Sequence, residues 1–170
     1  MKVAVTDANI FIDLINLKLI QSFFEFDFEA HTSLDVLEEL HDHQKEVLLA
    51  YKSTKKLTVH ILSPEDLDAM QTFTTSNKLS DADKSVIFVA HKEKAMLLSS
   101  DGPARKIAKE KNLETHGLVW LFDEFVQHKI ISPKVACTKI SELLTTNRRY
   151  KEDKRMYEEF EKRLSKWQKY

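Results

Sequence analysis

The sequence predicts an α/β fold of three layers, in which helices cover both faces of a central parallel sheet. Short apolar segments alternate with amphipathic helical patterns through the first 116 residues, as in chains that form parallel sheets. The first segment, Val3–Val5, is a continuous apolar run of the kind found in buried parallel strands. From Gly117 onward the pattern is helical throughout, so we expect a helical C-terminal extension.

The individual elements follow one another in the order that this fold requires. A helical pattern begins at Ile10, and a short turn of helix near Phe23–Phe28 leads into the second strand. The later strands are expected at Phe28–Thr32, Leu57–Leu62, Ala95–Leu98 and Leu113–His116. Further helices are expected near residues 33–51, 64–76, 80–93, 104–111, 118–128, 133–145 and 152–169. Pro64 suits a first helical position and Ser80 suits a helix cap.

Composition narrows the class of protein. A chain of 170 residues, 42% apolar and 31% charged, fits an ordinary globular domain. The single cysteine, Cys137, suits a reducing compartment, so we expect a cytoplasmic protein. The first residues lack the pattern of a signal peptide, and no stretch approaches a membrane span. The net charge of −1 means that any nucleic-acid binding must use a local basic patch.

Two common kinds of site are excluded. Gly102 and Gly117 are the only glycines, which excludes the glycine-rich loops that bind phosphates and dinucleotides. The seven histidines are scattered and form no H-E-x-x-H motif, so a zinc site is not expected.

Acidic residues follow two of the predicted strands. Asp7 comes directly after Val3–Val5 and Thr6, and Asp101 follows Ala95–Leu98, so both should lie at the carboxyl edge of the sheet. Asp7 has a second interpretation as the cap of the helix that follows it.

A third acid, Asp83, falls on the apolar face of its helix, where a charge is costly unless it is paired or binds a metal. The apolar residues of that face are Leu79, Ala82, Val86, Ile87 and Ala90. The alternative is a capping box between Ser80 and Asp83. The helical wheel places Glu38 and Glu39 on opposite flanks of the apolar face formed by Leu37 and Leu40. Periodicity therefore cannot decide which glutamate joins the other acids.

Several carboxylates around one pocket have a clear chemical use. Crowded like charges are destabilising unless a cation neutralises them. Oxygen ligands without histidine or cysteine favour Mg²⁺ or Mn²⁺. Such ions activate water and stabilise the charge of a phosphoryl group.

Four segments, in order, are similar to the four motifs of the PIN-domain nucleases, particularly the stand-alone prokaryotic proteins related to VapC-type toxins. VAVTDANIFIDL resembles the first motif, with Asp7 as its aspartate and Asn9 beside it. SLDVLEEL resembles the second motif, whose glutamate directly precedes a leucine, and this selects Glu39 over Glu38.

The third and fourth motifs supply the remaining acids. LSDADKSVIFVA resembles the third motif through Asp83, and Asp81 is a neighbouring acid that could share its role. LLSSDGPARKIAKEKNL resembles the fourth, with Asp101 and an auxiliary Ser99. The later stretch GLVWLFDEFVQHKIISPKVACTKISELL is similar to the helical tail of one PIN-like subgroup.

The resemblance implies a parallel sheet of about five strands and Mg²⁺- or Mn²⁺-dependent endonuclease activity, usually on RNA. It also implies the toxin of a toxin–antitoxin pair, with an antitoxin protein and a second copy of the chain as partners. Many relatives carry a further acid just after the fourth motif, where this chain has Arg105 and Lys106. The sequence therefore leaves open whether the site holds one metal ion or two. The alternative is a catalytically inactive PIN-like module that binds RNA or a protein.

Two basic clusters are candidates for holding RNA, although lysines on exposed helices also serve solubility. Lys84, Arg105 and Lys106 flank the acids, and Arg148, Arg149 and Lys151 form the second cluster. The second cluster lies in the polar segment Thr145–Lys151, the expected boundary between a nuclease domain at 1–145 and a C-terminal helix at 146–170.

The last helix carries an apolar stripe that could dock on its own domain, on a second copy or on an antitoxin. The stripe consists of Met156, Tyr157, Phe160, Leu164 and Trp167.

Overall fold

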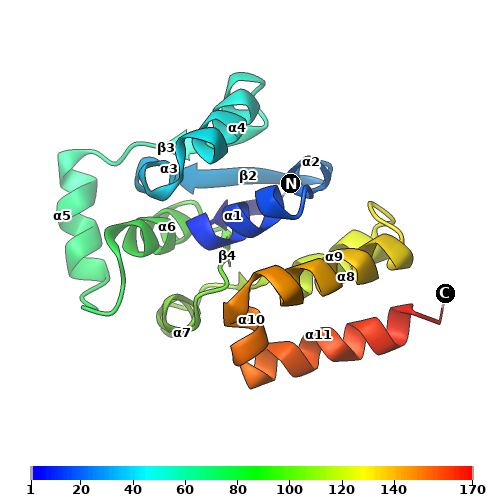
Figure 1. Ribbon diagram of the computed structural model, residues 1–170. Helices are drawn as coiled ribbons and strands as arrows, with labels where there is room; N and C mark the ends of the chain where they lie inside the picture. Colours follow the sequence, from blue (N-terminus) through cyan, green and yellow to red (C-terminus); the bar gives the residue numbers. More distant parts are fainter. Residues whose placement is uncertain (1, 170) are drawn as a thin grey trace. The chain divides into compact units, whose positions relative to one another are not determined.

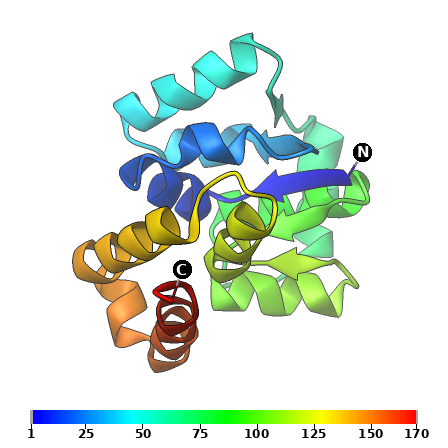
Figure 2. The same ribbon diagram turned by 90° about the vertical axis from the view of Figure 1, so that its right-hand side faces the viewer.

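The computed structural model describes residues 2–169 and contains one sheet of five parallel strands (Figures 1 and 2). The strand order is β3-β2-β1-β4-β5, so the first strand of the chain is the middle strand of the sheet. The strands are β1 (Lys2–Thr6), β2 (Phe28–Ser33), β3 (Leu57–His60), β4 (Met96–Leu98) and β5 (Thr115–His116). The predicted three-layer α/β/α fold and its five parallel strands are confirmed.

The chain divides into two units, which we describe separately. The sheet unit consists of Met1–Ile12 and Asp27–Gly117, and the helical unit of Asp13–Phe26 and Leu118–Tyr170. Helices of the sheet unit are α3 (Leu34–Glu39), α4 (Asp42–Ser53), α5 (Pro64–Phe73), α6 (Asp81–Lys92) and α7 (Gly102–Glu110). Helix α6 packs on β1, β2 and β4, whereas α4 packs on β3 and α7 on β5. Helix α1 (Ala8–Asn16) directly follows β1.

Apolar packing explains why these short segments form strands. Ala4 and Val5 of β1 and Leu97 and Leu98 of β4 are completely buried, as parallel strands covered by helices on their faces should be. Their register pairs Thr6 with Leu98, so β1 and β4 end side by side.

In the sheet unit, two of the predicted helices differ from the structure. The expected helix near 33–51 is two helices, because Leu40 adopts an extended conformation directly after Glu39. The break points the side chain of Leu40 into the core, where it is buried. Helix α5 ends at Phe73 rather than near Ser76, since Thr74 leaves the helical conformation. The residues between Phe73 and α6 are therefore a loop.

The helical unit is built on aromatic packing. Its helices are α2 (Ile20–Phe23), α8 (Leu118–Gln127), α9 (Pro133–Thr146), α10 (Arg148–Glu152) and α11 (Lys154–Trp167). Phe160 is completely buried and makes edge-to-face contacts with Phe122 and Tyr150. Of the stripe on α11, Phe160, Leu164 and Trp167 are buried within this unit, while Tyr157 is exposed. Helix α10 was not predicted; its cap is Asn147, whose side chain accepts a hydrogen bond from the backbone N–H of Arg149.

Candidate active site

The ends of β1 and β4 bring two of the predicted acids to one edge of the sheet. The backbone N–H of Asp7 donates to the carbonyl of Leu98 at 3.0 Å, which extends the β1–β4 ladder by one residue. Asp101 lies three residues beyond Leu98, which is the last residue of the neighbouring strand β4. Both acids therefore occupy the carboxyl edge of a parallel sheet, where open α/β folds place their ligands.

Both of these carboxylates also cap a helix. Oδ1 of Asp7 accepts from the N–H of Ile10 at 2.9 Å, and Oδ2 of Asp101 accepts from the N–H of Ala104 at 2.7 Å. The capping interpretation of Asp7 is thus observed. A carboxylate has two oxygens with about four lone-pair sites, so a cap leaves room for a further interaction.

Ser99 holds the loop that carries Asp101. Its side chain is completely buried, and its Oγ accepts a hydrogen bond from the N–H of Asp101 at 3.1 Å. Asn9 lies half-buried in the first turn of α1, two residues after Asp7. These are positions from which both residues could orient the acids.

Helix α6 brings Asp83 toward the same edge. The helix ends just before β4 begins, so its N-terminus lies on the side where β4 ends. Oγ of Ser33, the last residue of β2, lies 2.6 Å from Oγ of Ser85 and ties the end of that strand to α6. Asp83 itself is in the capping box that the sequence left open. Its Oδ2 accepts from the backbone N–H and the hydroxyl of Ser80 at 3.1 and 3.0 Å.

Glu39 and Glu38 are separated by their surroundings. Partial burial raises the pKa of the Glu39 carboxyl, and a hydrogen bond with the Ser80 side chain lowers it. The negative charges of Asp83 and Asp35 raise the pKa of Glu39 further. Both side chains are exposed, but Glu39 faces the N-terminus of α6, whereas Glu38 pairs with Lys45 at 2.6 Å.

The four acids match a hard divalent cation in their chemistry, since all of their donor atoms are carboxylate oxygens. The mutual effect of Glu39 and Asp83 is the repulsion that a cation relieves. As their side chains stand, no three Asp, Glu, His or Cys residues within 2–169 converge closely enough to hold a metal. Asp7 and Asp101 thus lie at one sheet edge, and Asp83 and Glu39 lie near the N-terminus of α6. Three of the four acids, Asp7, Asp83 and Asp101, are engaged in helix capping.

The predicted basic residues differ in accessibility. Lys84 is half-buried and its Nζ lies 3.4 Å from Oε1 of Gln71. Arg105 packs inward against Gly117. A Cβ added at Gly117 would lie only 3.0 Å from Nη1 of Arg105, so the glycine leaves room for the guanidinium group. Lys106 is exposed.

The remaining polar candidates lie elsewhere on the surface. Asp81 is exposed in the first turn of α6. Arg148 and Arg149 belong to the helical unit, where Arg148 pairs with Glu152 at 2.5 Å and Arg149 lies over the ring of Tyr150.

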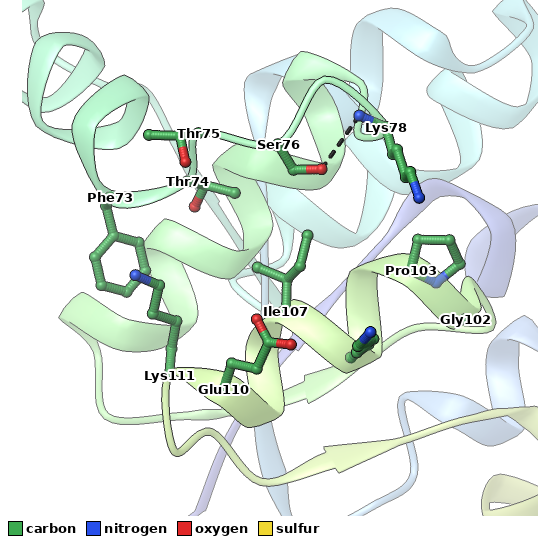
Figure 3. Close-up of a pocket in the computed structure, with 11 residues that line it drawn as sticks. Phe73, Thr74, Thr75, Ser76, Lys78, Gly102, Pro103, Ile107, Glu110 and Lys111 are labelled. Carbon is green, nitrogen blue, oxygen red and sulfur yellow. Dashed lines mark hydrogen bonds between the residues drawn. The ribbon is translucent and has the colours of Figure 1, made fainter.

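A pocket that the sequence did not predict lies between the loop after α5 and helix α7 (Figure 3). Its volume is about 610 Å³. The loop contributes Thr74, Ser76 and Lys78, and α7 contributes Gly102 and Lys106. Reading residues 74–76 as helix concealed the pocket; the polar run TTSNK before Ser80 was the signal that could have indicated a loop.

Comparison with known proteins places nearly all of the chain in one family. The family model DUF3368, described as a PIN domain, matches residues 3–166. A search of curated proteins found no match. Among the helices of residues 2–169, none has the length and apolar character needed to cross a membrane.

Proposed function

Because the chain belongs to the PIN-domain family, whose fold is generally that of a nuclease, we propose that it is a Mg²⁺- or Mn²⁺-dependent endoribonuclease. The observation that carries this proposal is the placement of acids at one sheet edge. Asp7 and Asp101 follow adjacent parallel strands, and Asp83 and Glu39 meet at the N-terminus of α6 on the same side.

In this proposal Asp7, Glu39, Asp83 and Asp101 hold one or two metal ions. A bound Mg²⁺ or Mn²⁺ would supply water activation and stabilisation of the phosphoryl charge. The protein's own part is to fix the donors. Ser99 restrains the backbone of Asp101, and Ser80 restrains the carboxylate of Asp83. Asn9 is close enough in sequence to Asp7 to orient that acid or the water. Asp81 is exposed in the first turn of α6 and is given no part in holding the ion.

The substrate would be held through its phosphates. Lys84, Arg105 and Lys106 are the candidates beside the acids, and Lys106 is the exposed one. Arg148 and Arg149 form a separate basic cluster for the same role in the helical unit. Binding through phosphates would show a steep loss of affinity with salt.

The biological setting of the proposal is a cytoplasmic toxin that is held inactive by an antitoxin protein and acts as a homodimer. The competing function is a PIN-like module that binds RNA or protein without cutting it. One observation favours that alternative: no three acids within residues 2–169 converge as the side chains stand.

The deciding experiment measures cleavage of a labelled single-stranded RNA with Mn²⁺, and with EDTA in its place. The matched variants are Asp101→Asn, which keeps a good helix cap, and Asp81→Asn, which removes an exposed acid. We expect Asp101→Asn to lose activity by about 100-fold or more, the scale of one charge-stabilising group, and Asp81→Asn to retain most of it. A wild-type protein that cuts no RNA with Mn²⁺ would leave the binding module as the function.

A further inference from the structure

We propose that the pocket between the loop after α5 and helix α7 binds one nucleotide of single-stranded RNA beside the acids. The proposal rests on the proposed function for its choice of RNA as ligand. The pocket's volume of about 610 Å³ lies within the range of about 300–1,000 Å³ typical of ligand sites. The pocket belongs entirely to the sheet unit. Its lining residues are Phe73, Thr74, Thr75, Ser76, Lys78, Gly102, Pro103, Lys106, Ile107, Glu110 and Lys111.

The pocket adjoins the acids on both of its walls. On one wall, Gly102 directly follows Asp101 in the chain. On the other wall, Lys78 precedes by two residues Ser80, which holds the carboxylate of Asp83. A strand of RNA whose nucleotide occupies the pocket would therefore continue toward the edge where the proposed chemistry takes place.

The charge of the lining suits a polyanion. Three lysines line the pocket against a single acid, Glu110. The Nζ of Lys111 lies 4.6 Å from the centre of the Phe73 ring and is engaged there. Lys78 and Lys106 are exposed, and Figure 3 shows the Lys78 side chain extending toward Pro103 on the opposite wall. These two ammonium groups are placed to bind the phosphates that flank a nucleotide.

A buried hydroxyl at the pocket wall marks a place for a polar ligand atom. Thr74 is 1% exposed, and within residues 2–169 its Oγ1 has no hydrogen-bond partner. Buried polar groups in proteins are nearly always hydrogen-bonded, so an orphan hydroxyl beside a pocket requires an explanation. A hydroxyl both donates and accepts, and can therefore pair with the edge of a nucleobase.

The aromatic residue of the pocket is not free to stack on a base. His91 lies against Phe73 with a centroid distance of 4.5 Å, and Lys111 lies over the same ring. The surfaces left for a base are the aliphatic side chains of Ile107 and Pro103. Recognition would thus combine aliphatic packing, the Thr74 hydroxyl and phosphate contacts, which differs from proteins that stack successive bases on aromatic rings.

The first test measures binding of a short labelled single-stranded RNA by fluorescence anisotropy in EDTA, as a function of salt. We expect Lys78→Ala and Lys106→Ala each to weaken binding at low salt by about threefold or more and to reduce the salt slope by about 0.7. The control is Lys109→Ala, which removes an exposed lysine of the same helix that does not line the pocket. Equal losses in all three variants would overturn the proposal, because they would show general attraction to a basic surface.

A second variant tests the pocket without changing its charge. Thr75 is exposed at the pocket, so Thr75→Trp should be tolerated and should fill the space. We expect it to weaken RNA binding severalfold and to abolish the NMR shifts that uridine 5′-monophosphate induces at Thr74. Unchanged RNA binding and unchanged shifts would refute the pocket.

Cleavage with Mn²⁺, measured on the same variants, separates the two proposals. If wild-type protein cuts RNA but the pocket variants bind and cut normally, the pocket proposal alone fails. If binding depends on the pocket and no RNA is cut, the nuclease proposal fails and the pocket stands.

Discussion

The hydroxyl of Tyr150 donates a hydrogen bond of 2.6 Å to Oδ2 of Asp13, a carboxylate that is 5% exposed. Asn147 donates to the other oxygen at 2.9 Å. Burial raises the pKa of Asp13, and the two hydrogen bonds and the charge of Arg149 act in the opposite direction. The contact joins α10 to the C-terminal part of α1 within the helical unit, so a buried acid depends on partners more than 130 residues away.

Tyr150→Phe should destabilise the protein by about 1.5–3 kcal/mol, the range for a hydrogen bond to a charged group. The ring and its packing on Phe160 are retained, so the loss reports the hydroxyl alone. The measurement is urea denaturation, with Tyr157→Phe as the control because Tyr157 is exposed on α11. Equal effects of both substitutions would contradict this assignment.

The hydrogen bond between Tyr150 and Asp13 also predicts how the stability of the protein depends on pH. Because folding raises the pKa of Asp13 above 3.8, the folded state holds its proton to higher pH than the unfolded state. The contribution of Asp13 to stability is therefore full at low pH and declines as pH rises from about 3.8 through the folded pKa. Tyr150→Phe removes a hydrogen bond that lowers this pKa, so the decline should extend to higher pH.

His31 and His60 predict a loss of stability on the acid side of neutrality. Nε2 of His60 lies 3.0 Å from Nδ1 of His31, and burial lowers the pKa of both rings. The unfolded chain therefore binds more protons below about pH 6.5, and stability falls as pH decreases through that window. Thermal unfolding between pH 7.5 and 5 should show this slope weakened in the double variant His31→Gln, His60→Gln.

The control for the histidine pair is His43→Gln, since His43 is exposed on α4. It should leave the slope of the wild type in place. A slope that survives in the double variant would assign the acid sensitivity to other groups.

The centre of the sheet was predictable because β1 and β4 are largely buried on both faces and so appear as short apolar runs. Neither of the two apolar runs alternates between apolar and polar residues, so neither resembles a half-exposed strand. Both runs, Val3–Val5 and Ala95–Leu98, form strands near the expected positions. Helix ends were less predictable, since they depend on single side chains. The break after Glu39 arises because Leu40 turns into the core, and helical periodicity continues across it without a signal.

The candidate site likewise combines features that the strand topology fixes with features that depend on single side chains. Strand ends fix the backbone positions of Asp7 and Asp101, and those follow from topology. The orientation of a carboxylate is a local matter, and the sequence could not decide whether Asp83 caps its helix; it does. The pocket at Thr74 was missed because it is formed by a loop whose neighbour, α7, lies about 30 residues further along the chain.

Glu39→Gln should abolish RNA cleavage while leaving the fold intact. Glu39 faces Ser80 and Asp83, whereas the adjacent Glu38 pairs with Lys45 at the surface. Removing the Glu39 charge also relieves repulsion against Asp83, so we expect stability to be unchanged or slightly increased. The control, Glu38→Gln, removes only a surface ion pair, which is worth at most about 1 kcal/mol, and should cut normally. Loss of activity in Glu38→Gln alone would reverse the assignment.

Asp83→Asn should remove metal binding at little cost to the fold. The carboxylate of Asp83 accepts two hydrogen bonds from Ser80 at the N-terminus of α6, where a negative charge contributes about 0.3–1 kcal/mol. Asparagine keeps an oxygen for the capping box and relieves repulsion against Glu39, so we expect a net destabilisation below about 1 kcal/mol. Titration calorimetry with Mn²⁺ should detect binding to the wild type and none to the variant.

The comparison that gives this experiment its meaning is Asp81→Asn, in the first turn of the same helix. Asp81 is exposed, and its substitution by asparagine removes the same charge as Asp83→Asn. A general electrostatic effect on the cation would therefore appear in both variants. Binding lost only in Asp83→Asn would place the ion at the acids of the sheet edge. Mn²⁺ binding that survives in Asp83→Asn would exclude Asp83 from the site. A wild type that binds no Mn²⁺ would favour the RNA- or protein-binding module, because four acids that serve only as caps and surface charges have no need of a cation.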